Sequence, residues 1–157
     1  MGAKINSISR LYLTIFRSKK VYFTITTELK AHFILFFYAQ VIKREKGHVK
    51  FGISPLAIWR NHKQDPSGSF TNCGQSSYDN LYCDTKLWIE ESWVDYMAPQ
   101  LYWSTSNEFA NYNHLINWWT KNEYDRHLYV GHAIYKLDTK NRHSFGKEEL
   151  VKQVNIS

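Results

Sequence analysis

A polar and aromatic group of side chains closes the stretch from Trp93 to Trp103. The stretch begins as a mostly apolar run and ends with Gln100, Tyr102 and Trp103. A carboxamide both donates and accepts hydrogen bonds, and a ring with a polar edge also offers a flat apolar face. These side chains therefore suit a ligand that carries hydroxyl groups on an apolar ring, as a sugar does. The alternative for Trp103 is that its ring packs a loop against a helix.

Candidates of the same kind follow two other apolar runs. Trp59 and Asn61 come after residues 49–54, and His132 and Tyr135 come after residues 127–131. A neutral imidazole can bond a sugar hydroxyl or orient an acid. A structural role stands beside each of these interpretations: Trp59 can pack a loop, Asn61 can order the loop that it begins, and a lone histidine is often a structural residue.

The runs 49–54, 93–103 and 127–131 are predicted to be the strands that place these groups. Pro55 and Pro99 lack a backbone donor and suit strand exits. Helical periodicity predicts helices over 28–46, about 77–91, about 109–122 and 146–155. The buried face of the second helix is expected to be Tyr78, Leu81, Tyr82, Thr85, Trp88 and Ile89, and Cys83 also falls within this helix. The buried faces of the other two are expected to be Tyr112, Leu115, Ile116 and Trp119 in the third helix, and Leu150, Val151 and Val154 in the last.

Alternating strands and helices predict a parallel sheet with right-handed crossovers, in which the strand exits form one ligand-binding end. Three strands are too few to close an eight-stranded barrel. No glycine-rich dinucleotide or phosphate motif is present, so an arc of a (β/α) barrel fits better than a nucleotide-binding sheet. Upstream, residues 11–16 and 21–26 read as two short strands of a separate extension.

The composition fits one globular domain, and its basic charge is confined to one part of the chain. The 157 residues carry a formal net charge of +6, but residues 1–50 contribute +8 and residues 51–157 contribute −2. A basic arm can bind nucleic acid or anionic lipid. Because the aromatic candidates lie in the other part, the charge split argues against a nucleic-acid interface.

The sequence shows no pattern typical of a disulfide framework, a metal site or a membrane-spanning segment. Cys73 and Cys83 make neither a disulfide framework nor a zinc motif. His127 and His132 lack the spacing and carboxylate partner of a metal site. The apolar stretch 29–42 is shorter than the ~20 residues that span a bilayer. We expect no metal, no cofactor and no membrane span, and no targeting segment is visible.

Five blocks of sequence resemble one bacterial protein family. They are Phe51–Pro55, Ile58–Asn61, Tyr78–Thr85, Trp93–Trp103 and Leu128–Ala133, and they occur in the order typical of the glycosyl hydrolase-like 10 domain. The resemblance covers about residue 31 to the end. It implies a (β/α)8 barrel that hydrolyses O-glycosidic bonds, of which this chain holds the fifth, sixth and seventh strands. Residues 1–27 would be an extension and residues 28–157 an incomplete barrel domain.

The acids that glycoside hydrolysis requires are not evident in this chain. Two carboxyl groups must flank the scissile bond, roughly 5 to 10 Å apart. Asp95 lies near the start of its strand, at the wrong end, and is interpreted as structural. The remaining acids considered lie in loops or at helix starts, where solvated charge is the commoner explanation; they are Asp65, Asp79, Asp84, Glu108 and Asp138. The catalytic residues therefore stay unassigned, and we expect little activity from the chain alone.

Two functions of different kinds remain open at this point. One is a glycoside hydrolase-like segment with a carbohydrate substrate, whose full-length bacterial relatives are expected to be exported or at the cell surface. The other is a non-catalytic carbohydrate-binding protein. The open edges of a three-stranded sheet also predict self-association.

Overall fold

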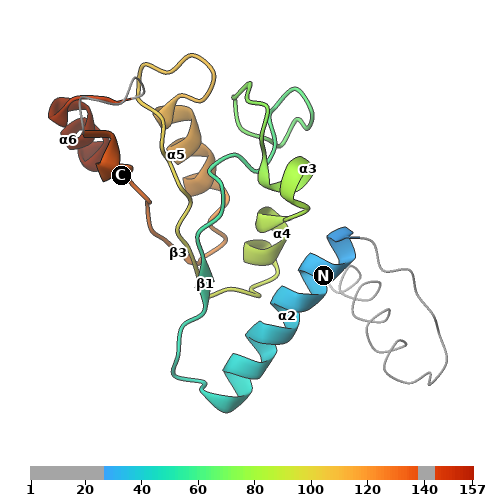
Figure 1. Cartoon of the computed structure of the whole chain (residues 1–157). Coiled ribbons are helices and arrows are strands. Elements are labelled where there is room, and N and C mark those ends of the chain that lie inside the picture. Colours follow the sequence, from blue (N-terminus) through green and yellow to red (C-terminus); the bar gives the residue numbers. More distant parts are fainter. Residues whose placement is uncertain (1–26, 138–143) are drawn as a thin grey trace.

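The computed structural model describes residues 27–137 and 144–157, which form six helical segments and three strands (Figure 1). In chain order these are α2 (Thr27–Glu45), β1 (Gly52–Ile53), α3 (Ser77–Leu81), α4 (Thr85–Glu90), β2 (Tyr96–Met97), α5 (Tyr112–Lys121), β3 (His127–Leu128), the 3-10 helix η1 (Ile134–Leu137) and α6 (Lys147–Ile156). The predicted strands 11–16 and 21–26 lie outside the described residues.

The three strands form one parallel sheet in the order β1-β2-β3, as the alternation of elements predicts. Tyr96 pairs with Gly52 on one side and His127 on the other. The regular ladders are only two residues long, but backbone hydrogen bonds continue past them. Gln100 N donates to Pro55 O at 3.0 Å, and Leu101 N donates to Gly131 O at 3.0 Å. The predicted α/β sheet of three parallel strands with flanking helices is confirmed.

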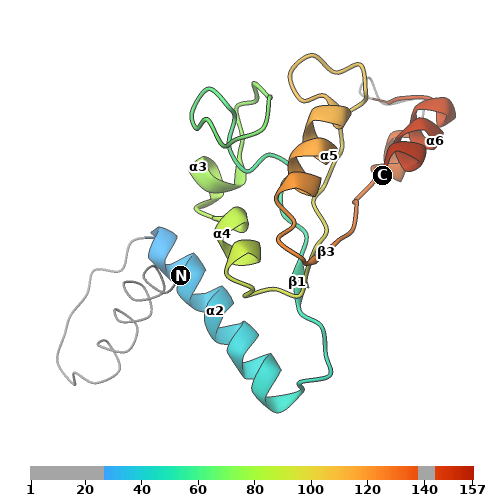
Figure 2. The same ribbon diagram turned by 180° about the vertical axis from the view of Figure 1, so that it is seen from behind.

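One face of the sheet is packed against helices and holds the hydrophobic core. Met97 and Leu101 are fully buried there with Leu115 and Trp119 of α5 and Ile89 of α4. The indole of Trp119 donates to Ala57 O at 2.7 Å, which ties α5 to the segment after β1. Figures 1 and 2 show α4 and α5 on the same side of the strands.

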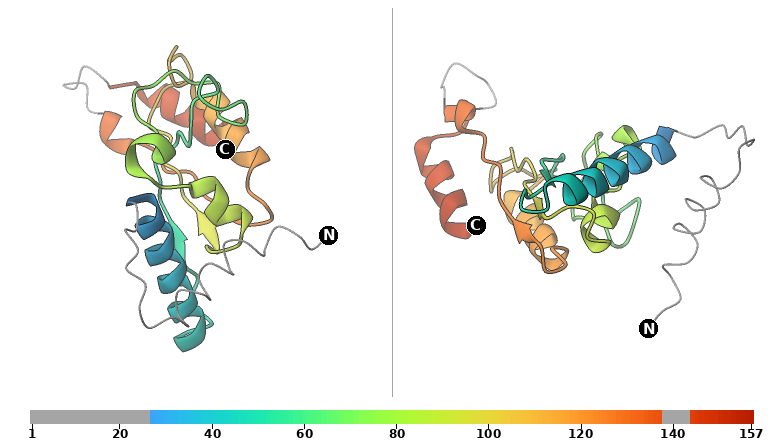
Figure 3. Two further views of the ribbon diagram at one scale, coloured as in Figure 1. Left: turned by 90° about the vertical axis from the view of Figure 1, so that its right-hand side faces the viewer. Right: turned by 90° about the horizontal axis from the view of Figure 1, so that it is seen from below.

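The first and last helices of the described residues, α2 and α6, lie at opposite ends of the described part of the molecule (Figure 3). Helix α2 joins the core through Phe36, whose ring meets Trp93 edge-on with 5.1 Å between centroids. Helix α6 instead contacts the segment after β2. Neither of these helices, nor any other within residues 27–137 and 144–157, is long and apolar enough to cross a membrane.

The single helix predicted over about 77–91 is wrong, because the chain breaks it into α3 and α4. Tyr82 has a left-handed φ of 55°, and the carboxylate of Asp84 accepts a hydrogen bond from Leu87 N at 3.1 Å to cap α4. Aspartate favours such a cap over a helix interior. Leu81 and Tyr82 consequently leave the predicted buried face and are 52% and 42% exposed. Cys83 lies in the link between the two helices.

Helix α6 begins where predicted but turns a different face inward. Val151 and Val154 are 49% and 55% exposed, whereas Gln153 is fully buried. Polar contacts set this rotation: Glu149 accepts hydrogen bonds from Thr105 N and Oγ1 at 2.7 and 2.9 Å, and Gln153 Nε2 donates to Trp103 O at 3.1 Å. The predicted apolar face assumed hydrophobic docking, which these hydrogen bonds override. Helix α5, by contrast, buries the four residues expected of it.

Candidate functional site

The exit ends of the three strands meet in one row formed by Leu56, Gln100 and Gly131. Parallel bridges pair Gln100 with Leu56 on one side and with Gly131 on the other. A Cβ at Gly131 would lie 3.1 Å from Pro99 O, so the row is tightly spaced here. The amide of Gln100 donates to Ser54 O at 3.0 Å. This bond orients the amide, and its carbonyl oxygen has no partner among the described residues.

Tyr102 and Tyr135 form an aromatic pair next to this row. Their ring centroids lie 6.0 Å apart with an interplanar angle of 82°. Tyr135 belongs to η1 and is 61% exposed. Lys136 fastens η1 to the segment after β2, since its ammonium donates to the carbonyl of Tyr102. Burial lowers the pKa of Lys136. The pair therefore presents ring surface that is accessible and held in place.

His132 follows Gly131, and its side chain packs against α5. Its imidazole stacks on the ring of Tyr112 with 6.0 Å between centroids and an interplanar angle of 20°. Its Nδ1 is buried and has no hydrogen-bond partner in the part of the chain that the structure describes. Any hydrogen bond to a ligand must therefore use Nε2. His132 lies beside the exit row rather than in it.

Trp103 is half-buried and lines a separate small hollow of about 220 Å³. The opposite wall comes from the loop after β1 and includes Cys73, Gly74 and Gln75. Burial raises the pKa of the Cys73 thiol. Gln75 is exposed and adds a second amide near an aromatic ring, which sequence reasoning missed.

Trp59 and Asn61 are occupied by contacts inside the protein. The Trp59 ring is 6% exposed, stacks on Trp118 at 5.9 Å and donates from Nε1 to Asp84 at 2.9 Å. Asn61 is 3% exposed; its Oδ1 accepts from Thr71 Oγ1 and from Cys73 N at 2.8 and 3.0 Å. These contacts support the loop-ordering alternatives for both residues.

Arg60 also holds the loop 60–77 in place, through ion pairs with two acids. Its guanidinium bonds Asp65 at 3.2 Å and Asp79 at 2.9 Å, and it lies 4.6 Å from the centre of the Tyr78 ring. Hydrogen bonds from the Ser67 hydroxyl and backbone, together with Arg60, hold the pKa of Asp65 below its usual value. Both acids are thus committed to the loop.

The remaining candidate acids either hold a backbone or side-chain donor of the protein or lie in an exposed loop. Asp95 accepts a hydrogen bond from Phe51 N at 2.9 Å, at the start of β2. Asp84 holds the Trp59 indole and the start of α4, and Glu108 is exposed in the loop before α5. Asp138 lies outside the described residues. No group of three or more His, Cys, Asp and Glu residues that suits a metal ion occurs within 27–137 and 144–157.

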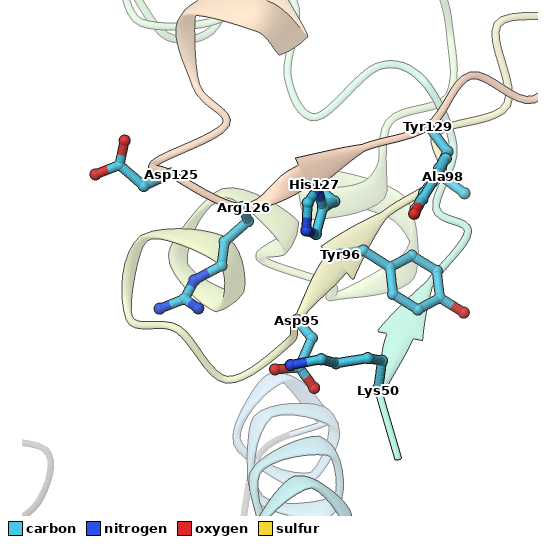
Figure 4. A pocket seen from close by; sticks show the side chains of 8 residues that line it. All are labelled: Lys50, Asp95, Tyr96, Ala98, Asp125, Arg126, His127 and Tyr129. Carbon is cyan, nitrogen blue, oxygen red and sulfur yellow. The ribbon is translucent and has the colours of Figure 1, made fainter. Parts of the chain in front are cut away.

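A second, larger hollow of about 480 Å³ opens toward the other end of the sheet (Figure 4). Tyr96, His127 and Tyr129 line it, and Lys50 and Asp95 stand at its margin. It lies on the strands themselves, whereas the exit group follows them.

Most of the chain matches one family of known proteins. Residues 30–146 match the family described as Glycosyl hydrolase-like 10. The chain is 45% identical over 121 residues to Glycosyl hydrolase YngK of Bacillus subtilis, which is 75% of this chain and 24% of that protein. It is 38% identical over 127 residues to Glycosyl hydrolase DigH of Escherichia coli K12, which is 76% of this chain and 29% of that protein. The chain thus spans about a quarter of the length of these relatives.

Proposed function

The chain belongs to the glycosyl hydrolase-like 10 family, and from that membership we propose that it contributes a carbohydrate-binding end to an O-glycosyl hydrolase. The observation that supports this most is the row of Leu56, Gln100 and Gly131 at the exits of three parallel strands. Ligands of parallel α/β folds bind at that end. Both relatives carry the name glycosyl hydrolase, which is consistent with a sugar ligand.

The proposed fold is a part of a (β/α)8 barrel. The sequential order β1-β2-β3 with helices on one side supports it, because that is the arrangement of a barrel wall. Residues 28–157 are the proposed incomplete barrel domain and residues 1–27 an extension. The family match over residues 30–146 is consistent with this division.

Gln100, Tyr102 and Tyr135 are the side chains that we propose to touch the sugar. An amide and two ring faces can bond hydroxyl groups and cover pyranose C–H groups at once. Trp103 and His132 are proposed as neighbouring contacts. Trp59 and Asn61 are proposed to act indirectly, because both are buried in the contacts that order the loop 60–77.

We expect hydrolysis by this chain alone to be slow or absent. Asp65, Asp79, Asp84 and Asp95 are each engaged by the protein's own donors. A glycosidase needs one carboxyl group free to protonate the leaving oxygen and a second to act as base or nucleophile. The engagement of these four acids is the observation that favours the second candidate, a protein that binds carbohydrate without cleaving it.

A glycan array followed by calorimetry tests the binding proposal. We expect at least one oligosaccharide to bind, and both Gln100→Ala and Tyr135→Ala to weaken it about tenfold through lost hydrogen bonding or ring contact. Tyr38→Ala is the matched control, since Tyr38 is 58% exposed on α2. A blank array, or equal affinities for all variants, would contradict the proposal. Hydrolysis of the bound glycan by a full-length relative supports the first candidate, whereas a relative that binds the same glycan without cleaving it supports the second.

A further inference from the structure

The small hollow beside Trp103 adjoins the row at the strand exits. Leu56 belongs to both, since it lines the hollow and forms the parallel bridge to Gln100. Within the described part of the chain the hollow is lined by six residues, which are Leu56, Ile58, Cys73, Gly74, Gln75 and Trp103. A ligand that contacts Gln100 therefore has this hollow as its neighbour on the β1 side.

The lining of the hollow is apolar apart from one amide and one thiol. Ile58 is 1% exposed, and the ring of Trp103 is half-buried. Burial raises the pKa of the Cys73 thiol, which is therefore neutral at pH 7. Gln75 is exposed, and its amide can both donate and accept hydrogen bonds. None of the six lining residues is charged, so the hollow suits a neutral group, because a carboxylate without a partner is costly to bury.

Both walls of the hollow are held in place by hydrogen bonds. On one side Asn61 Nδ2 donates to Cys73 O at 2.9 Å, and Asn61 Oδ1 accepts from Cys73 N at 3.0 Å. On the other side Gln153 Nε2 donates to Trp103 O at 3.1 Å. A site whose walls are already ordered loses little conformational entropy when a ligand binds. The hollow is therefore prepared to receive a ligand.

Gly74 keeps the hollow open. A Cβ added at Gly74 would meet no atom within 4 Å, whereas a Cβ at Gly68 in the same loop would lie 2.5 Å from Arg60 O. Gly74 has no positive φ, so its backbone conformation is open to other residues. Neither packing nor backbone geometry calls for a glycine at this position. The missing side chain instead leaves space beside the ring of Trp103.

The volume of the hollow, about 220 Å³, limits what it can hold. Pockets that enclose a whole drug-sized ligand have roughly 300–1,000 Å³. The hollow therefore suits one ring of a longer ligand. The C–H face of a pyranose can pack on the indole of Trp103, and a hydroxyl group of the same ring can bond the amide of Gln75.

We propose that this hollow is a second sugar subsite, which takes a neutral pyranose ring next to the ring bound at Gln100. In this subsite the sugar packs on Trp103 and bonds the amide of Gln75, and Gly74 provides the space. The ligand of the strand exits is then an oligosaccharide of at least two units, with an uncharged unit at the hollow. The inference rests on the proposed function, because the sugar at Gln100 defines its neighbour.

The test is calorimetry with one glycan shortened in steps. The probes are the oligosaccharide that binds best on the glycan array and the same compound shortened one sugar at a time from each end. We expect one of these steps to weaken binding about tenfold, through the lost ring contact and hydrogen bond. A single sugar that binds as tightly as every longer compound would overturn the proposal.

Two variants at the hollow identify the step that belongs to it. Gly74→Val fills the hollow, and we expect it to abolish the tenfold step while the shortened compound binds as before. Gln75→Ala should reduce the step to about threefold, because the ring contact remains. Gln64→Ala is the matched control, since Gln64 is an exposed glutamine of the same loop outside the lining.

Thermal unfolding checks that each variant folds, and Gln75→Ala tests the subsite even if Gly74→Val is unstable. A step of full size in both variants, or a charged sugar at the position that the variants affect, would overturn the proposal. An equal loss with Gln64→Ala would also overturn it.

The outcome for the hollow is separable from the outcome for the proposed function. Affinity that falls with Gln100→Ala but not with the hollow variants supports the proposed function and overturns the second subsite. Affinity that falls with the hollow variants but not with Gln100→Ala locates the sugar in the hollow and contradicts the proposed contact at Gln100. An array without any bound glycan overturns both.

Discussion

Two pairs of tyrosines in this protein have nearly the same geometry and very different surroundings. Tyr102 and Tyr135 meet at 82° with centroids 6.0 Å apart, and Tyr96 and Tyr129 meet at 84° with centroids 5.5 Å apart. In each pair one ring is largely exposed, 61% for Tyr135 and 57% for Tyr129. Ring geometry and exposure alone would assign them the same role.

Their neighbours distinguish them. The exit pair follows Gln100, whose amide donates to Ser54 O, and it is held by the ammonium of Lys136, which donates to the carbonyl of Tyr102. Of the other pair, Tyr96 has its ring over Gly52, and Ala98 lines the same hollow as both rings. Directed hydrogen-bonding groups next to a ring suit a polar ligand, whereas small residues beneath a ring suit close packing. Two aromatic pairs of the same geometry are therefore expected to differ in function because their neighbouring residues differ.

The largest expected effect comes from the core on the helix-covered face of the sheet, outside both pairs. Trp119 is fully buried and bonds Ala57 O from its indole nitrogen. Trp119→Ala should destabilise the fold by about 3–5 kcal/mol, through the cavity and the lost hydrogen bond. Chemical denaturation measures this. Trp103→Ala, at a half-buried indole, should cost clearly less; equal losses would mean that the core is not centred on α5.

A smaller effect should reach the exit side alone. Asn61→Ala leaves Cys73 N without its acceptor inside the loop 60–77 and removes the shorter of two acceptors of Thr71 Oγ1, which keeps Ser69 O at 3.3 Å. We expect a loss of about 2 kcal/mol and altered binding next to Trp103. Asn72→Ala, in the same loop, is the control, because the hydrogen bond at that position uses the backbone. Identical stability of the two variants would show that Asn61 does not hold the loop.

The third expected effect is a pH dependence of stability, and it arises at Glu149, which bonds the segment after β2. Burial alone would raise the pKa of Glu149, but hydrogen bonds from Thr105 and Gln153 outweigh it and lower the pKa. A carboxyl whose pKa is lower in the folded state stabilises the fold above its unfolded pKa. That contribution is lost as the pH falls through the unfolded pKa and then the folded one.

Thermal unfolding between about pH 6 and about pH 3 measures this dependence. Glu149→Gln should flatten the acid limb of the stability profile. Glu148→Gln, at the exposed neighbouring carboxylate, should keep it. A profile that Glu149→Gln leaves unchanged would mean that α6 does not depend on this carboxylate.

Sequence reasoning reached the repeating parts of the fold and failed where single polar contacts decide. The alternation of apolar runs predicted the parallel strands, and helical spacing predicted the buried face of α5. It missed the break at Tyr82, because the capping carboxylate of Asp84 outweighs helical periodicity. It misplaced the buried face of α6, because Glu149 and Gln153 bind a loop more than forty residues earlier in the chain.

The candidate site shows the same limit. Strand exits can be read from prolines and polar endings, so Gln100, Tyr102 and Tyr135 were predictable as neighbours. The burial of Trp59 and Asn61 was not, since it depends on Trp118, Thr71 and Asp84 meeting them in three dimensions. Gln75 was missed because it comes from a loop whose path is set by Arg60 and Asn61.

The most direct test of the assignment follows the two tyrosine pairs during one titration. Proton and carbon NMR shifts of Tyr135 and Tyr129, with the side-chain amide of Gln100, are recorded while a glycan from the array is added. We predict saturable shifts at Gln100 and Tyr135 with Tyr129 unchanged. Shifts at Tyr129 without any at Gln100 and Tyr135 would contradict the assignment of the strand exits as the sugar-binding end.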